Sequence, residues 1–251
     1  MDKILDLILI AIILLCAWTG YKKGVIMGLG GILIIIISIY AANLVSNTFS
    51  YEVIPAMRPF VSGYMDPQIK YSVYDSLGIP YDPESGNPFN EQNDHMLSVN
   101  DLIIQNPDIA HTVGKLTYRR LGIVDSASER LATEAEKYHE ASNVSLQTAI
   151  VEVLCSKAAF ALGFILAFII ILTVFTVAGN ILNLSFKIPN FDLLNDAGGA
   201  VLGLVTGFLF CFVIVWVLQF TGKLISEQTI AEAGITSWFM RRDVLGRYLG
   251  L

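Results

Sequence analysis

Long apolar runs separated by short polar stretches dominate two parts of this chain. Three runs contain no charged residue, namely Val25 to Tyr51, Ala158 to Phe186 and Ala197 to Gly222, and a shorter one extends from Ile4 to Thr19. A helix rises about 1.5 Å per residue, so about 20 apolar residues cross the roughly 30 Å of hydrocarbon in a bilayer. The pattern therefore predicts four transmembrane helices, and the first run is expected to be a retained helix rather than a cleaved signal peptide because bulky residues follow it.

The four predicted spans form two hairpins, residues 1–45 and 157–222. Between them, residues 46–156 carry seven Lys or Arg against fifteen Asp or Glu. Helical periodicity recurs in this acidic segment, and no strand alternation of useful length is present. The predicted fold class is therefore an all-α polytopic membrane protein with a mostly helical extracytoplasmic segment and an amphipathic tail, residues 223–251.

Two stretches near the ends of the acidic segment predict particular helices. Pro55 suits a helix start, and the apolar positions from Met57 to Met65 predict a helix that lies along the membrane surface. Another helix is predicted to begin near Ser145 and to continue without a break into the third span.

Basic residues in short turns indicate the orientation of the spans. Lys22 and Lys23 lie between the first two apolar runs, and Lys187 lies between the last two. Short loops rich in Lys and Arg stay in the cytoplasm, so both termini and residues 46–156 are predicted to lie outside. The basic residues of the tail oppose this assignment only weakly, because most of them are far from a span.

Composition supports a membrane class and excludes most enzyme classes. The residues are 54% hydrophobic and 15% charged, and the mean hydropathy is +0.61. The three cysteines and three histidines show no metal-ligand spacing, and no nucleophile, phosphate-loop or dinucleotide motif is present. We therefore expect no catalytic, metal or cofactor site and no nucleic-acid partner. Asp6 is the one carboxylate inside a predicted span, near its outer end.

Glycines spaced four apart mark two of the predicted spans. Such a series lies on one helix face and lets another helix approach until the backbones touch. The run Gly28-Leu-Gly-Gly31 is likewise explained better by helix packing than by phosphate binding. The two glycine faces are expected to meet at the centre of the molecule or across an oligomer. The predicted packing residues are Gly20, Gly24 and Gly28 in the second span and Gly199, Gly203 and Gly207 in the fourth.

The tail has the pattern of an amphipathic helix at a membrane surface. Apolar residues from Ile235 to Leu249 fall on one side, while Arg241, Arg242 and Arg247 can face lipid phosphates.

Several of these motifs resemble the colicin V production protein (CvpA) family of small bacterial inner-membrane proteins. The resemblance lies in the turn Gly20-Tyr21-Lys22-Lys23-Gly24, in Lys187-Ile-Pro189, in Leu193-Leu-Asn195 and in the glycines from Gly199 to Gly207. It covers about half of the chain, the spans and their inner turns, and the long acidic segment departs from short members. The resemblance implies a multi-pass protein of the inner membrane that is linked to toxin production or export and to envelope function, without an established reaction.

Two functions remain open at this point. The first is a non-enzymatic helical scaffold in the lipid bilayer that forms homo-oligomers and contacts an extracytoplasmic protein partner. The second is a channel or small-solute transporter lined by the two hairpins. A polar cavity between the spans would favour transport, whereas an interior packed with Leu, Ile and Phe would favour the scaffold.

Overall fold

The computed structural model describes residues 2–82, 98–181, 192–219, 234–242 and 244–249. Every regular element in these ranges is a helix, which agrees with the predicted class. The chain forms two compact units. Unit 1 comprises the described residues of Met1–Phe49, Phe160–Leu218 and Ile225–Gly250, and unit 2 comprises mainly those of Ser50–Ala159.

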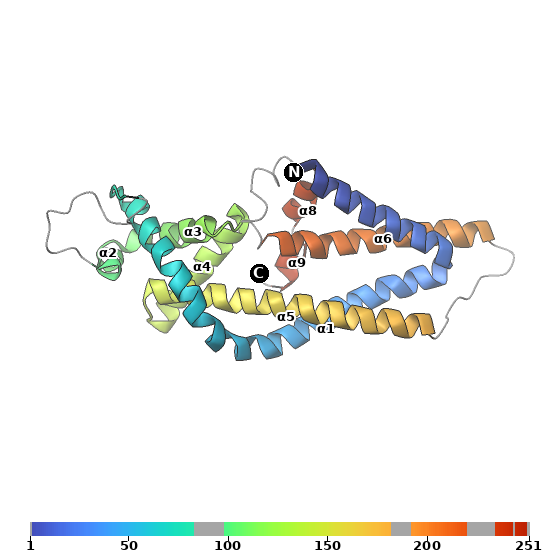
Figure 1. The fold of residues 1–251 in the computed structure, drawn as a ribbon, viewed down its shortest axis with the longest axis horizontal. Helices are drawn as coiled ribbons and strands as arrows, with labels where there is room; N and C mark the ends of the chain where they lie inside the picture. Colours follow the sequence, from blue (N-terminus) through green and yellow to red (C-terminus); the bar gives the residue numbers. More distant parts are fainter. Residues whose placement is uncertain (1, 83–97, 182–191, 220–233, 243, 250–251) are drawn as a thin grey trace. The chain divides into compact units, whose positions relative to one another are not determined.

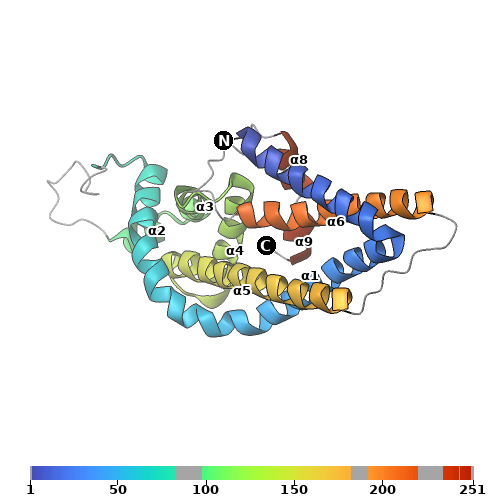
Figure 2. The ribbon, with the colours of Figure 1, turned by 45° about the vertical axis from the view of Figure 1, so that its right-hand side comes forward.

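The longest element, α1 (Asp2–Leu77), is interrupted at one residue. Gly24 has φ 78° and ψ 177°, which are not helical angles. Figures 1 and 2 both show the chain reversing direction in this part of α1, so residues 2–49 form a helical hairpin. Only glycine adopts such a positive φ readily, and this explains why a hairpin forms without a loop.

Among the described residues, three helices are long and apolar enough to cross a membrane, namely α1, α5 (Leu146–Ile181) and α6 (Asp192–Leu218). The sequence predicts four spans because it treats the two sides of Gly24 as separate helices. As predicted, α5 begins directly after Ser145 and continues without a break into the third apolar run, where it is described as far as Ile181.

Unit 2 contains the end of α1, the start of α5 and four short elements between them. These are α2 (Val99–Gln105), the 3-10 helix η1 (Pro107–Ile109), α3 (Ala110–Arg120) and α4 (Asp125–Ser142). The prediction that a helix starts at Pro55 is wrong, because α1 continues through Pro55, Pro59 and Pro67. The prediction that this stretch lies along the membrane surface is also wrong at Met65, which other helices of unit 2 bury completely.

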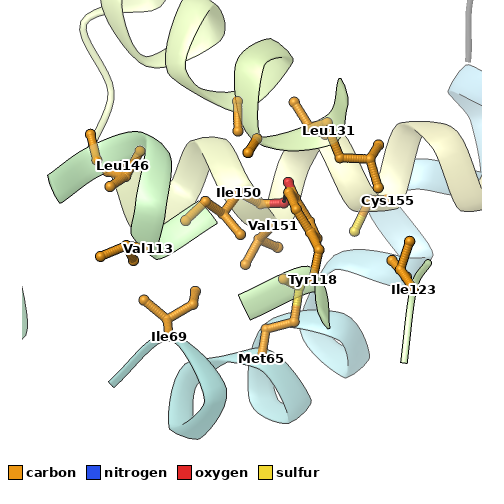
Figure 3. Packing of buried hydrophobic residues seen from close by; sticks show 14 of the residues in the cluster. Met65, Ile69, Val113, Tyr118, Ile123, Leu131, Leu146, Ile150, Val151 and Cys155 are labelled. Atoms are coloured by element: carbon orange, nitrogen blue, oxygen red, sulfur yellow. Dashed lines mark hydrogen bonds between the residues drawn. The ribbon is translucent and has the colours of Figure 1, made fainter. Parts of the chain in front are cut away.

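The core of unit 2 is built from apolar side chains of α1, α3, α4 and α5. Ile69 of α1 and Val113 of α3 are both completely buried, as is Ile150 of α5 (Figure 3). Burial of one such side chain stabilises the folded state by about 1.5–3 kcal/mol. This core makes unit 2 a folded module rather than a loop between spans.

A buried hydrogen bond fixes α3 against α5 inside this core. The hydroxyl of Tyr118 donates to the carbonyl oxygen of Ile150 at 2.9 Å. Burial raises the pKa of Tyr118 above its ordinary value, because the charged phenolate would lose its water.

Ion pairs link the helices of unit 2 at its surface. Lys115 Nζ of α3 lies 2.8 Å from Glu129 Oε2 of α4, and Lys157 Nζ of α5 lies 2.9 Å from Glu134 Oε1. Arg120 also pairs with Asp75 at the end of α1.

The described residues of the tail form two short helices, α8 (Gly234–Arg242) and α9 (Val244–Leu249). Phe239 of α8 is 1% exposed and packs with Leu9, Cys211 and Val215 of unit 1. Much of the apolar side of the tail therefore contacts protein, and the prediction that this side faces lipid is wrong at Phe239.

Candidate functional site

The two glycine series lie against each other within one chain. A Cβ atom added at Gly20 would lie 2.3 Å from the carbonyl oxygen of Gly199, and one added at Gly203 would lie 2.3 Å from that of Cys16. A Cβ at Gly207 would lie 2.8 Å from Cα of Ile13. Such distances leave no room for any side chain, so the first half of α1 and α6 approach backbone to backbone.

The break at Gly24 is closed by a side chain from α6. The backbone N–H of Val25 donates to Oδ1 of Asn195 at 3.1 Å, and Asn195 is 2% exposed. A helix start leaves its first N–H groups without partners inside the helix, and an Asn side chain is well suited to accept from them. Asn195 therefore acts as a cap for the second half of α1, although it belongs to another helix.

The amide of Asn195 also explains why position 24 is glycine. A Cβ atom at Gly24 would lie 2.4 Å from Nδ2 of Asn195. Glycine is therefore required at position 24 for two reasons: its φ is positive, and the capping side chain leaves no room for a Cβ atom.

Asp6 joins the two ends of unit 1. Its carboxylate accepts hydrogen bonds from the backbone N–H groups of Ile235 and Thr236 at 3.2 and 2.9 Å, and from the hydroxyl of Thr236 at 2.8 Å. A carboxylate at a helix N-terminus satisfies free N–H groups and interacts favourably with the helix dipole. The one carboxylate noted in the predicted spans therefore caps α8 and binds the tail to the first helix.

Unit 1 contains a cavity of about 270 Å³ between both halves of α1, α5 and α6. Its apolar walls come from α1, α5 and α6, and the one charged residue among its described lining residues is Lys23. The apolar lining side chains are Met27, Ile34, Ile35, Leu172 and Phe210, and the other polar ones are Cys16, Thr19, Thr176 and Thr206.

The glycines that line this cavity differ in how close their neighbours are. Gly20, Gly28 and Gly203 are in tight contact with a neighbouring helix, whereas a Cβ at Gly30 would meet nothing within 4 Å. A Cβ at Gly31 would meet only Thr206 Oγ1, at 3.9 Å. The interpretation of Gly28-Leu-Gly-Gly31 as a packing motif is therefore wrong at Gly30, whose missing side chain leaves open space.

Aromatic and basic side chains surround the turn at Gly24. The rings of Trp18 and Tyr21 stack with centroids 6.3 Å apart, and Nζ of Lys22 lies 5.1 Å from the centroid of Trp18. Trp, Tyr and Lys concentrate where a membrane meets water. Tyr21, Lys22 and Lys23 are all exposed, as expected at such a boundary.

Some predicted residues lie outside the part that the structure describes. Lys187 and Pro189 fall in residues 182–191, and the side chain of Arg247 is also not described. Arg241 and Arg242 are exposed on α8, and Arg242 lies 5.3 Å from the centroid of Trp238.

Sequence reasoning missed the cap made by Asn195 and the cavity. The only signal for the cap was a polar residue at the start of an apolar span, and polar groups are costly there unless they have partners. The described residues contain no group of three His, Cys, Asp or Glu side chains that could hold a metal ion.

In the part of the chain that the structure describes, these features define an all-helical protein with three membrane-length helices and a separately packed helical unit. Residues 135–242 match the family model of the colicin V production protein, which confirms the resemblance to this family over that part of the chain. The match is shorter than half of the 251 residues. It includes Asn195 and the glycines of α6, whereas the turn Gly20 to Gly24 lies outside it. No curated protein and no solved structure matches the chain significantly.

Proposed function

We propose that this chain is a non-enzymatic, multi-pass protein of the bacterial inner membrane that acts as an oligomeric helical scaffold. In this role it supports toxin production or export, or envelope homeostasis, as proteins of the colicin V production type are expected to do. The observation that carries the proposal is the backbone contact between α1 and α6 at Gly20 and Gly199. Small residues that let two helix backbones touch are typical of helix packing in membranes, and this supports a packed scaffold.

The proposed topology has four spans, with α1 divided at Gly24. The stacked Trp18 and Tyr21 and the lysines beside them support a turn at the cytoplasmic surface. Asp6 binds the start of α8, so the N-terminal end of the first span and the tail lie on the same side. Both features agree with extracytoplasmic termini and with unit 2 outside.

Unit 2 offers this scaffold a folded surface for an extracytoplasmic protein partner. Its segment is acidic, and its helices are fixed by a core around Tyr118 and Ile150. A rigid surface binds a partner without the cost of ordering a loop.

The test of the scaffold is complementation of a strain that lacks the gene. Gly203→Leu should abolish rescue of toxin secretion and of resistance to envelope stress, because a side chain cannot fit against Cys16. Gly63→Ala is the matched control, since nothing lies within 4 Å of an added Cβ there, and it should rescue fully. Rescue by Gly203→Leu at normal protein levels would contradict the scaffold, and cross-linking in membranes would show whether the protein forms oligomers.

A channel or small-solute transporter is the second candidate, and the cavity at Lys23 is the observation that favours it. Its walls are mainly apolar, and the hydroxyl of Thr206 already donates to the carbonyl of Leu202 at 2.9 Å. Liposomes that contain the protein should therefore swell no faster than empty ones in gradients of small osmolytes. Faster swelling that Gly31→Leu suppresses would establish transport in place of the scaffold.

A further inference from the structure

We infer that the cavity of unit 1 binds one anionic phospholipid, with an acyl chain among the helices and the phosphate at Lys23. The inference deepens the proposed function and rests on its placement of unit 1 in the membrane. It depends on the lining of the cavity, its depth and the position of its charge.

The lining of the cavity suits a hydrocarbon chain better than a polar ligand. The cavity has a volume of about 270 Å³, is partly open and is lined by apolar side chains such as Ile34, Leu172 and Phe210. Water in such an apolar space would find few polar partners.

The cavity extends over most of one leaflet of a bilayer. Beyond the break at Gly24, its lining follows α1 from Met27 to Ile35. Eight residues of helix rise about 12 Å, and half of the hydrocarbon layer is about 15 Å. A lipid whose phosphate lies at Lys23 therefore has its acyl chain beside Ile34.

The charge of the cavity selects an anionic headgroup. Lys23 is its one charged residue among the described lining residues, and Lys22 precedes it at the membrane boundary that Trp18 and Tyr21 mark. Basic pockets between transmembrane helices on the cytoplasmic side bind acidic lipid headgroups. Lys22 differs from Lys23 because it lies over Trp18 and is not part of the cavity wall.

The missing side chains at Gly30 and Gly31 keep this space open. Neither position needs glycine for close helix contact, since the nearest atom to an added Cβ is at 3.9 Å or further. Both lie in α1 and both line the cavity. Glycine is less favourable than alanine inside a helix, and at these two positions its missing side chain leaves space in the cavity wall.

The cysteines provide a probe of occupancy. Cys16 lines the cavity and is partly exposed, whereas Cys155 and Cys211 are buried. The full chain would be placed in nanodiscs that hold one copy, made of phosphatidylcholine alone or with phosphatidylglycerol. Alkylation by N-ethylmaleimide would then be followed at Cys16 by peptide mass spectrometry.

Phosphatidylglycerol should slow alkylation of Cys16 about tenfold when it is present at about ten times its Kd. Lys23→Gln should remove this protection, and Lys22→Gln, the matched control, should keep it. Both lysines are exposed, so neither change threatens folding. Gly31→Leu should make the rate independent of the lipid, because its side chain occupies the cavity.

Other outcomes would overturn the inference. Equal rates in the two lipids would show that no anionic lipid binds, and equal effects of the two lysine changes would show only general surface attraction. Protection by free glycerol phosphate would indicate a headgroup site without an acyl chain, and protection only in discs with two copies would assign the cavity to a second chain. These readouts are made without cells, so failure here is distinguishable from failure of the scaffold in complementation.

Discussion

Helix α1 belongs to both units of this protein, but its large apolar side chains are exposed in unit 1 and buried in unit 2. In unit 1, α1 presents large apolar side chains outward, and Leu33 and Ile36 are 58% and 51% exposed. In unit 2, the same helix turns Met65, Ile69 and Val73 inward, and all three are 0% exposed. Unit 1 is held by contacts between backbones at glycines, whereas unit 2 is held by a packed side-chain core.

Under the proposed topology, the difference follows from the solvent of each unit, which is lipid for unit 1 and water for unit 2. Within a bilayer, apolar side chains gain little from leaving lipid, so close packing of small residues and hydrogen bonds must bring helices together. In water, burial of Ile69 and its neighbours supplies the stabilisation directly. We therefore expect each unit to be sensitive to a different kind of substitution.

The largest effect is expected from a side chain added to the glycine contact of unit 1. Gly203→Leu would place atoms where Cys16 and Ala17 already lie, with an added Cβ only 2.9 Å from Cα of Ala17. We expect destabilisation above about 3 kcal/mol, the upper part of the range for overpacked cores. Size-exclusion chromatography in detergent should show aggregated protein, and a monodisperse peak at the normal yield would contradict the contact.

Loss of the cap at the helix break should have the next largest effect. Asn195→Ala leaves the N–H of Val25 without its acceptor, which should cost about 1–2 kcal/mol. Hydrogen exchange of peptides around Val25 should become about 5 to 30 times faster. Asn43→Ala is the control, because the side chain of Asn43 accepts only from Asn47 in an exposed position, and it should leave these peptides unchanged.

Removal of the buried hydroxyl in unit 2 should cost less and should depend on pH. Tyr118→Phe loses the bond to Ile150, worth about 1 kcal/mol at neutral pH. Because burial raises the pKa of Tyr118 in the folded state, its contribution is complete below the ordinary tyrosine pKa of about 10 and is lost as the pH rises further. The two proteins should therefore converge in stability near pH 11 in hydrogen exchange of α3, and a constant difference would show that the hydroxyl is not desolvated.

The smallest effect should be a gain, and it is expected in unit 2. Gly63 is a helical glycine with nothing within 4 Å of an added Cβ. Replacement of Gly63 by alanine should stabilise unit 2 by about 0.5–1 kcal/mol through the lower entropy of the unfolded chain. Thermal unfolding that shows a loss would reveal a neighbour at this position.

Much of the membrane part could be predicted because its signals are local. Uncharged runs predicted long helices at α5 and α6, and the four-residue spacing of Gly199, Gly203 and Gly207 predicted a face free of side chains. The start predicted at Pro55 was wrong because proline is also tolerated inside a helix whose freed carbonyls find other partners. The cap could not be predicted, since it joins positions 170 residues apart.

The cap at Val25 also has a consequence for biogenesis. The acceptor, Asn195, is synthesised 170 residues after the N–H that it binds. Translation at about 5–20 residues per second separates the two by roughly 10–35 s. During that time the N–H of Val25 lacks this acceptor, so the break at Gly24 acquires its cap only after the start of α6 has been synthesised.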